Sequence, residues 1–145
     1  MTFTHIRLLA GYVDEERPVH EVLPARVVED GLVVLAGSPG LVLGCAAGDR
    51  LRVAADGGFE VVEPGGNLCL QAARPDGRGL APAEVGELST GMAELGGLVE
   101  APADGRFVVV TVARSAGWPA VERVMDAWVD GIGGVEWWVG NGDDA

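Results

Sequence analysis

The feature that most constrains the fold is the stretch from residue 118 to 132, whose apolar side chains recur at helical spacing. These are Val121, Val124, Met125, Trp128, Val129 and Ile132. Pro119 lies near the start and glycines crowd the end, as helix entry and exit favour. Because short β-prone runs lie directly before and after it, at 107–113 and 135–140, the helix is predicted to connect two strands.

The opposite face of this predicted helix is acidic. Glu122, Asp126 and Asp130 follow one another at intervals of four residues and therefore lie on one stripe. Such a stripe is ordinarily a solvated face. The alternative is an electrostatic docking surface for a basic protein.

The strand that follows contains two adjacent tryptophans, which alternation places on opposite faces of a sheet. Trp137 is predicted to face the helices, while Glu136 and Trp138 face the other way. Trp138 is then either covered by the N-terminal half of the chain or exposed as an aromatic anchor for a partner, a common role of tryptophan at interfaces.

Upstream, the same alternation of strands and helices extends back to residue 67. Strands are predicted at 67–73 and 98–101, with a helix between them that Pro82 opens and two glycines stop. Strand, helix, strand, strand, helix, strand is the ferredoxin-like βαββαβ order. Residues 67–141 are therefore predicted to form a ferredoxin-like subdomain, followed by a frayed polar tail over 142–145.

The first 66 residues show a different pattern, with short alternating runs separated by glycine-containing turns. Five strands are predicted, at 2–12, 19–28, 32–36, 50–53 and 59–63. The apolar segment 41–47 has no settled secondary structure. Residues 1–66 are predicted to form a small antiparallel β-barrel-like subdomain. Because the link at 64–66 is too short for free movement, the two subdomains are expected to pack together in an α+β protein.

Charge narrows the choice of partners. The chain has 22 acidic and 10 basic residues, which gives a net charge of −12. Phosphates and anionic lipid surfaces would be repelled, so neither nucleic acid nor a membrane is expected as a partner. A basic protein partner is compatible with this charge, and so is a simple role in solubility.

Compartment is indicated by what the sequence lacks. No signal peptide is apparent, and no apolar run approaches the roughly 18 residues that span a bilayer. Cys45 and Cys69 are widely spaced in apolar surroundings, which favours reduced core thiols over a disulfide. A cytoplasmic protein is therefore expected.

No set of residues predicts catalysis or metal binding. The two histidines, His5 and His20, lie on predicted strands, and nothing in their spacing requires either to meet Cys45. The acidic clusters at 14–16 and 143–144 are too local to form a metal cage. We therefore expect a protein without enzymatic activity, metal or cofactor, and only a cleft that joins Cys45 to a histidine would revive an enzyme.

The segment from Val22 to Val53 resembles a bacterial family, Domain of Unknown Function 4265. The matching motifs are Glu21-Val22-Leu23-Pro24-Ala25, Ser38-Pro39, Gly48-Asp49 and the pair Leu51 and Val53. Two departures stand out: Leu41 and Leu43 replace aromatic residues, and Pro64-Gly65-Gly66 replaces a Ser-Gly-His-like turn. The resemblance extends loosely over most of the chain and implies no mechanism.

These observations lead to two functional hypotheses. The first is a non-enzymatic intracellular binding protein that engages a basic protein, in its sharpest version an immunity-type inhibitor of a toxin. Glu122, Asp126, Asp130, Glu136 and Trp138 are its predicted contact residues. The second is a sensor or carrier that binds a small molecule between the two subdomains, by analogy of fold.

Overall fold

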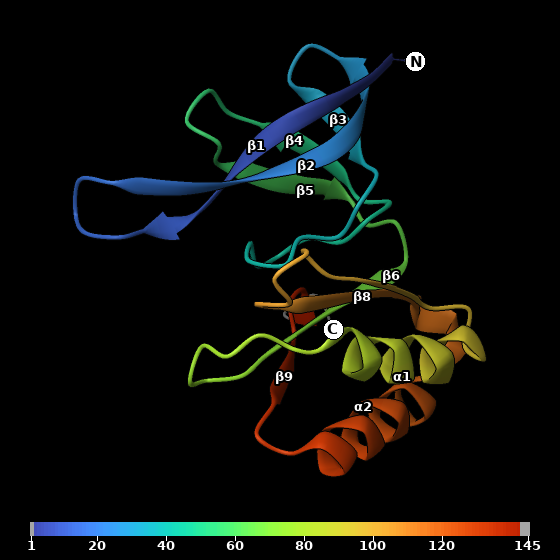
Figure 1. Ribbon diagram of the computed structural model, residues 1–145. Helices are drawn as coiled ribbons and strands as arrows, with labels where there is room; N and C mark the ends of the chain where they lie inside the picture. Colours follow the sequence, from blue (N-terminus) through green and yellow to red (C-terminus); the bar gives the residue numbers. More distant parts are fainter. Residues whose placement is uncertain (1, 143–145) are drawn as a thin grey trace.

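The computed structural model describes residues 2–142 and contains two antiparallel sheets and two α-helices (Figure 1). The N-terminal sheet has the order β1-β2-β3-β4-β5, from β1 (Thr2–Tyr12), β2 (Pro18–Glu29), β3 (Leu32–Leu35), β4 (Arg50–Val53) and β5 (Phe59–Glu63). The C-terminal sheet has the order β7-β8-β6-β9, from β6 (Asn67–Ala73), β7 (Leu98–Glu100), β8 (Val108–Ala113) and β9 (Glu136–Val139). The helices are α1 (Pro82–Ala93) and α2 (Trp118–Ile132). The predicted α+β class is confirmed.

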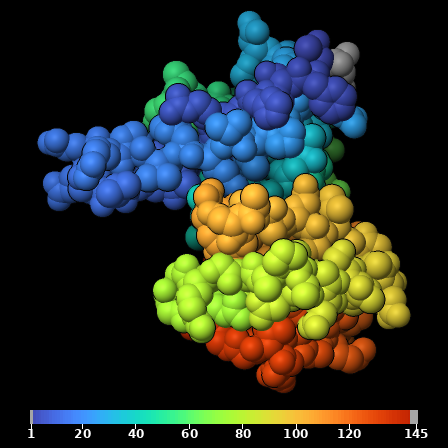
Figure 2. Space-filling view, in the orientation of Figure 1, coloured from blue at the N-terminus to red at the C-terminus, as the bar shows by residue number. Residues whose placement is uncertain are grey.

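The N-terminal sheet is open, so the predicted barrel-like closure is wrong. The sheet is an antiparallel meander with β1 and β5 at its two ends. In the described residues, β1 meets the turn before β5 and not β5 itself, so no strand pairing joins the two ends of the sheet. One backbone hydrogen bond, from the N–H of Leu9 to the carbonyl of Gly57 at 2.9 Å, holds β1 to the turn between β4 and β5. The end of β1, the start of β2 and the turn between them project from the body as an arm (Figures 1 and 2).

The C-terminal sheet carries both helices on one face (Figure 1). The core between them contains Leu88 and Met92 from α1 and Val121, Met125 and Trp128 from α2, which are the buried residues of the two helices. Pro119 lies in the first turn of α2 and Gly133 caps its end. Both α2 and β6 have the predicted bounds. The predicted tail lies outside the described residues apart from Gly142.

The segment between β3 and β4 occupies the space between the two sheets (Figure 1). Residues 36–49 are irregular, yet Ser38, Pro39, Val42, Cys45 and Ala46 are all buried. Buried backbone groups outside a helix or sheet must find other partners. We call residues 36–49 the junction loop, because side chains from both halves supply those partners.

On the N-terminal side, two carboxylates hold the junction loop. Glu21 on β2 accepts hydrogen bonds from the backbone N–H groups of Gly40, Leu41 and Val42, at 2.8, 2.9 and 3.0 Å. Asp49 accepts from the N–H groups of Ala46 and Gly65 through its two oxygens. The loop and the link to β6 are therefore fixed to one another.

On the C-terminal side, the junction loop is held by side chains of the sheet. Gln71 on β6 donates to the carbonyls of Pro39 and Val42, both at 2.9 Å. The hydroxyl of Thr111 on β8 donates to that of Ser38 at 2.6 Å. These bonds join the two sheets into one unit, as expected from the short link at 64–66.

Two glycines in α1 lead to a prediction about stability. A methyl group at Gly86 meets open space, whereas one at Gly91 lies 3.1 Å from Cγ1 of Val124. We expect Gly86→Ala to raise the free energy of unfolding by about 0.5–1 kcal/mol, since alanine favours the helix more than glycine does. Gly91→Ala should gain less because Val124 must move. Urea denaturation compares the variants, and equal gains would contradict the packing between the helices.

An ion pair beside α1 leads to a prediction about pH. The carboxylate of Glu84 pairs with the guanidinium of Arg74 at 2.8 Å and accepts from the N–H of Ala81. The Arg74 guanidinium and then the Ala81 N–H lower the pKa of Glu84 from its ordinary 4.5. The stabilisation is therefore fully present above pH 4.5 and is lost as the pH falls through the lower folded-state pKa.

We expect the wild-type free energy of unfolding to fall more steeply with decreasing pH, below about pH 4.5, than that of Glu84→Gln. Glu87→Gln on the same helix controls for the loss of one charge. Denaturant titrations at a series of pH values measure the slopes. Parallel curves for the wild type and Glu84→Gln would show that the pair contributes nothing in solution.

Candidate functional site

The predicted contact residues of α2 lie on its solvent-facing side. Glu122, Asp126 and Asp130 are all exposed, while the buried residues of this helix face the sheet. Trp118 lies four residues before Glu122 on the same stripe and is 40% exposed. The sequence interpretation missed Trp118 as a surface residue, although the same four-residue spacing points to it.

Strand β9 adds a second aromatic side chain to this stripe. The indole N–H of Trp137 donates to the carboxylate of Asp126 at 3.0 Å. The rings of Trp118 and Trp137 are tilted against each other, with centroids 6.0 Å apart. The rings of Trp118 and Trp137 therefore border the acidic stripe of Glu122, Asp126 and Asp130.

Glu136 and Trp138 are exposed but lie on the other side of β9. Val135, Trp137 and Val139 pack with the helical core, as predicted, so alternation turns Glu136 and Trp138 away from the helices. The structure therefore divides the five predicted contact residues between two surfaces. Only Glu122, Asp126 and Asp130 share one of them.

Trp138 is partly covered and partly exposed, between the two alternatives that the sequence left open. Its side chain is 40% exposed, yet its indole N–H donates to Oε1 of Gln71 at 2.7 Å. Gln71 is 1% exposed and holds the junction loop through its amide group. Trp138 therefore lies beside the junction loop's anchor Gln71, with part of its ring in solvent.

The outer surface of the two helices is strongly acidic. Its exposed charged side chains are Glu87 on α1 and Glu122, Arg123, Asp126 and Asp130 on α2. A shallow groove of about 290 Å³ runs between the helices, with Leu88, Gly91, Val124, Ala127 and Gly131 among its lining residues. Glu87 also lines this groove, so an apolar floor lies beside negative charge.

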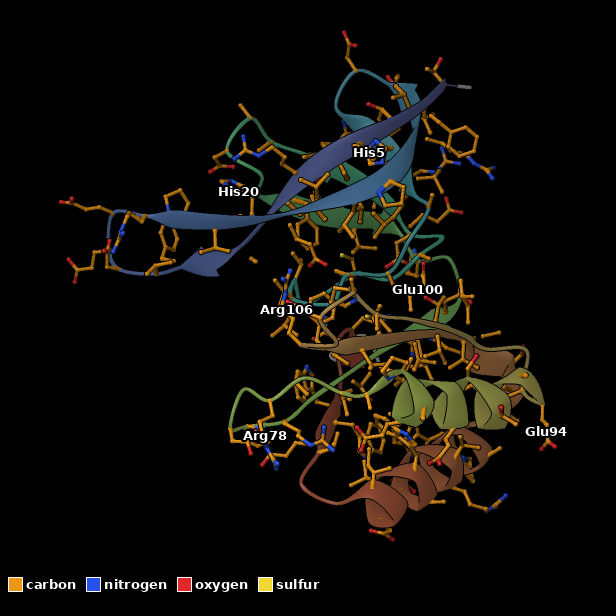
Figure 3. The ribbon with its side chains drawn as sticks, in the orientation of Figure 1. His5, His20, Arg78, Glu94, Glu100 and Arg106 are labelled. Carbon is orange, nitrogen blue, oxygen red and sulfur yellow. The ribbon has the colours of Figure 1, made fainter. Side chains whose placement is uncertain are left out.

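The two histidines lie on β1 and β2 of the N-terminal sheet (Figure 3). His5 is exposed, and the ring nitrogens of His20 contact Arg7 and the carbonyl of Asp56. Within residues 2–142, neither histidine hydrogen-bonds to Cys45. Burial raises the pKa of the Cys45 and Cys69 thiols to about 12, so both are protonated at neutral pH.

The described part of the chain has neither a metal-ligand cluster nor a membrane-spanning helix. Among residues 2–142, no three histidine, cysteine, aspartate or glutamate side chains are grouped as they would be around a metal ion. Neither helix of that range has the length and apolar character needed to cross a bilayer.

A second hollow lies where the two sheets meet. It has a volume of about 210 Å³ and is lined from the N-terminal side by Glu21, Leu23, Pro24, Gly37, Ser38 and Gly40. From the C-terminal side it is lined by Glu100, Ala101, Pro102, Phe107 and Val109, and Figure 3 shows Glu100 near the junction. The three N–H groups that hold Glu21 fix this carboxylate at the wall.

Together these features define a small two-sheet α+β protein with an acidic helical surface. A family model described as "Domain of unknown function (DUF4265)" matches residues 21–137. The chain belongs to this family, and the resemblance seen in the sequence is confirmed. The match begins at Glu21, the residue that holds the junction loop, and ends within β9.

Comparison with solved structures supports the fold alone. A structure described as a novel crystal structure of a hypothetical protein from Neisseria gonorrhoeae aligns with a TM-score of 0.70. The two chains are 11% identical, and the alignment covers 97% of this chain and 95% of that one. A comparison with curated proteins finds no match.

The bond between Trp138 and Gln71 leads to a prediction. Trp138→Phe removes the indole donor and leaves the buried Oε1 of Gln71 without it, so we expect the free energy of unfolding to fall by about 1–3 kcal/mol. Trp118→Phe is the matched control, since Trp118 has the same exposed fraction of 40%. Chemical denaturation measures both variants, and similar losses in the two would show that the bond is not important for stability.

Proposed function

We propose that the protein is a non-enzymatic intracellular binding protein that engages a basic protein partner through the outer surface of its helices. The supporting observation is the charge distribution there, with four exposed acidic side chains, Glu87, Glu122, Asp126 and Asp130, against the single Arg123. Opposite fields of this kind speed encounter and select against wrong partners. Trp118 supplies an exposed aromatic group of the type that anchors interfaces.

The acidic stripe destabilises α2, and this destabilisation supports the proposal. Like charges four residues apart destabilise a helix by about 0.2–0.5 kcal/mol per pair. Asp130 also lies in the last turn of α2, where the helix dipole disfavours negative charge and no basic residue compensates. A stripe that weakens its own helix is more readily explained by binding than by stability.

In its sharpest version, the protein is an immunity-type inhibitor that neutralises a basic toxin. The small size and the net charge of −12 are compatible with that role. Reduced, buried Cys45 and Cys69 are compatible with the cytoplasm, where such an inhibitor would act. We further propose that residues 67–141 are a ferredoxin-like subdomain, which the strand order β9-β6-β8-β7 and the two helices on one face support.

Binding of a small molecule between the two sheets is the second candidate. The hollow beside Glu21 and Glu100 supports it, because both halves of the chain contribute to its lining. Its volume of about 210 Å³ is below the ~300–1,000 Å³ that is usual for small-molecule sites. We therefore place this candidate after the basic protein partner.

The test neutralises the stripe with the triple variant Glu122→Gln, Asp126→Asn and Asp130→Asn. Asparagine at 126 keeps an acceptor for the indole of Trp137, so the aromatic pair is retained. We expect this variant to unfold with a free energy about 0.5–1 kcal/mol higher than the wild type, because repulsion along α2 is relieved. We also expect it to lose the salt-sensitive capture of a basic partner. Urea denaturation and affinity capture at low and high salt measure the two effects.

The matched control neutralises three exposed carboxylates of the N-terminal sheet and its arm, in Glu15→Gln, Glu16→Gln and Glu29→Gln. It changes the net charge equally and should keep the partner. Co-expression with each basic protein encoded by neighbouring genes tests the toxin version, since the wild type and the control should restore growth and the helix variant should not. Equal behaviour of the two triple variants would reject the helical surface as the binding site.

A further inference from the structure

A separate hollow lies at the end of the C-terminal sheet, close to the start of α2. It has a volume of about 360 Å³, within the range of small-molecule sites. Its described lining residues are Leu68, Arg114, Trp118, Val139 and Gly142. Leu68 is buried and Val139 is half-buried, so the walls are apolar for the most part. The hollow is distinct from the acidic outer surface, although Trp118 borders both.

Arg114 gives this apolar hollow a positive charge. Its guanidinium donates to the carbonyl of Asn141 at 3.4 Å, a long bond, and makes no other hydrogen bond within residues 2–142. Five other arginines form ion pairs with acidic side chains: Arg17, Arg52, Arg74, Arg78 and Arg106. Within residues 2–142, Arg114 has no such carboxylate partner.

The aromatic wall of the hollow is held in position. Trp118 packs against Trp137, whose indole N–H is bonded to Asp126. The N-terminal end of α2 begins at Trp118 and adds partial positive charge near Arg114. A planar guanidinium pairs with a carboxylate through two parallel hydrogen bonds, which fixes the orientation of the ligand.

We propose that this hollow binds a small apolar monocarboxylate. The apolar part of the ligand lies against Leu68, Val139 and Trp118, and its carboxylate pairs with Arg114. A single negative charge fits better than a phosphate, because one arginine faces the hollow and the whole chain carries −12. At physiological salt, charges beyond about 8 Å are largely screened, so distant carboxylates do not cancel the charge of Arg114.

The test uses the full chain with two probes, 4-phenylbutyrate and octanoate, and with the uncharged 4-phenylbutyramide. We expect both acids to give saturable heats in titration calorimetry and to change tryptophan fluorescence. The amide and the variant Arg114→Gln should each bind at least about tenfold more weakly, as loss of a charge-assisted pair requires. Arg123→Gln removes the same charge from the outer surface of α2 and should bind the acids as the wild type does. Circular dichroism verifies that each variant is folded.

Three results would overturn the proposal. The first is the absence of saturable binding of either acid, and the second is equal affinity for the acid and its amide. The third is binding that emerges only in the variant Asp143→Asn with Asp144→Asn, which would show that the acidic end of the chain itself occupies Arg114. None of these outcomes bears on the basic partner. The partner test changes residues 122, 126 and 130 of α2 and leaves Arg114 unchanged, so the two proposals can fail separately.

Discussion

The structure depends on the hydrogen bonding of a loop that is buried without regular secondary structure. The junction loop, residues 36–49, lies between two sheets, where its backbone groups are shielded from water. An unpaired buried N–H or carbonyl costs about 1–3 kcal/mol, so each buried group needs a hydrogen-bond partner. The side chains of Glu21, Asp49 and Gln71 supply several of these partners, and backbone carbonyls supply others. Hydrogen bonds of the junction loop therefore help to set the position of one sheet on the other, together with apolar contact among Ala46, Cys69 and Val109.

This junction also determines which surfaces remain free. One face of the C-terminal sheet is covered by the junction loop and the other by the two helices, so β6 and β8 are buried on both sides. The helices then present the outermost layer of this half of the molecule (Figure 2). Any partner that approaches from this side meets Glu87, Glu122, Asp126 and Asp130 before it meets the sheet.

Local periodicity explains which parts of the structure were predictable from the sequence. The bounds of α2 and β6, and the exposure of Glu122, Asp126 and Asp130, follow from spacing within one element. The path of the junction loop does not, because Gln71 binds it from 29 and 32 residues away. Closure of the N-terminal sheet depends on pairing between β1 and β5, which are far apart in the sequence, and the pattern within each strand does not specify that pairing. The contact between Trp118 and Trp137 is likewise not predictable from spacing within one element, because it joins α2 to the edge strand β9.

The distribution of charge separates residues that serve the fold from residues that weaken it. Glu21 and Glu84 each accept several hydrogen bonds and hold neighbouring segments in place. Asp130 lies at the negative end of its own helix, and Glu122 lies one turn from Asp126, so these charges repel one another. Asp126 accepts the indole N–H of Trp137, whereas Glu122 and Asp130 accept no hydrogen bond within residues 2–142. Solubility alone does not require this placement, since a carboxylate anywhere on the surface serves it equally. Within the described residues, the fold therefore explains Asp126 but not the placement of Glu122 and Asp130 on the same stripe of α2.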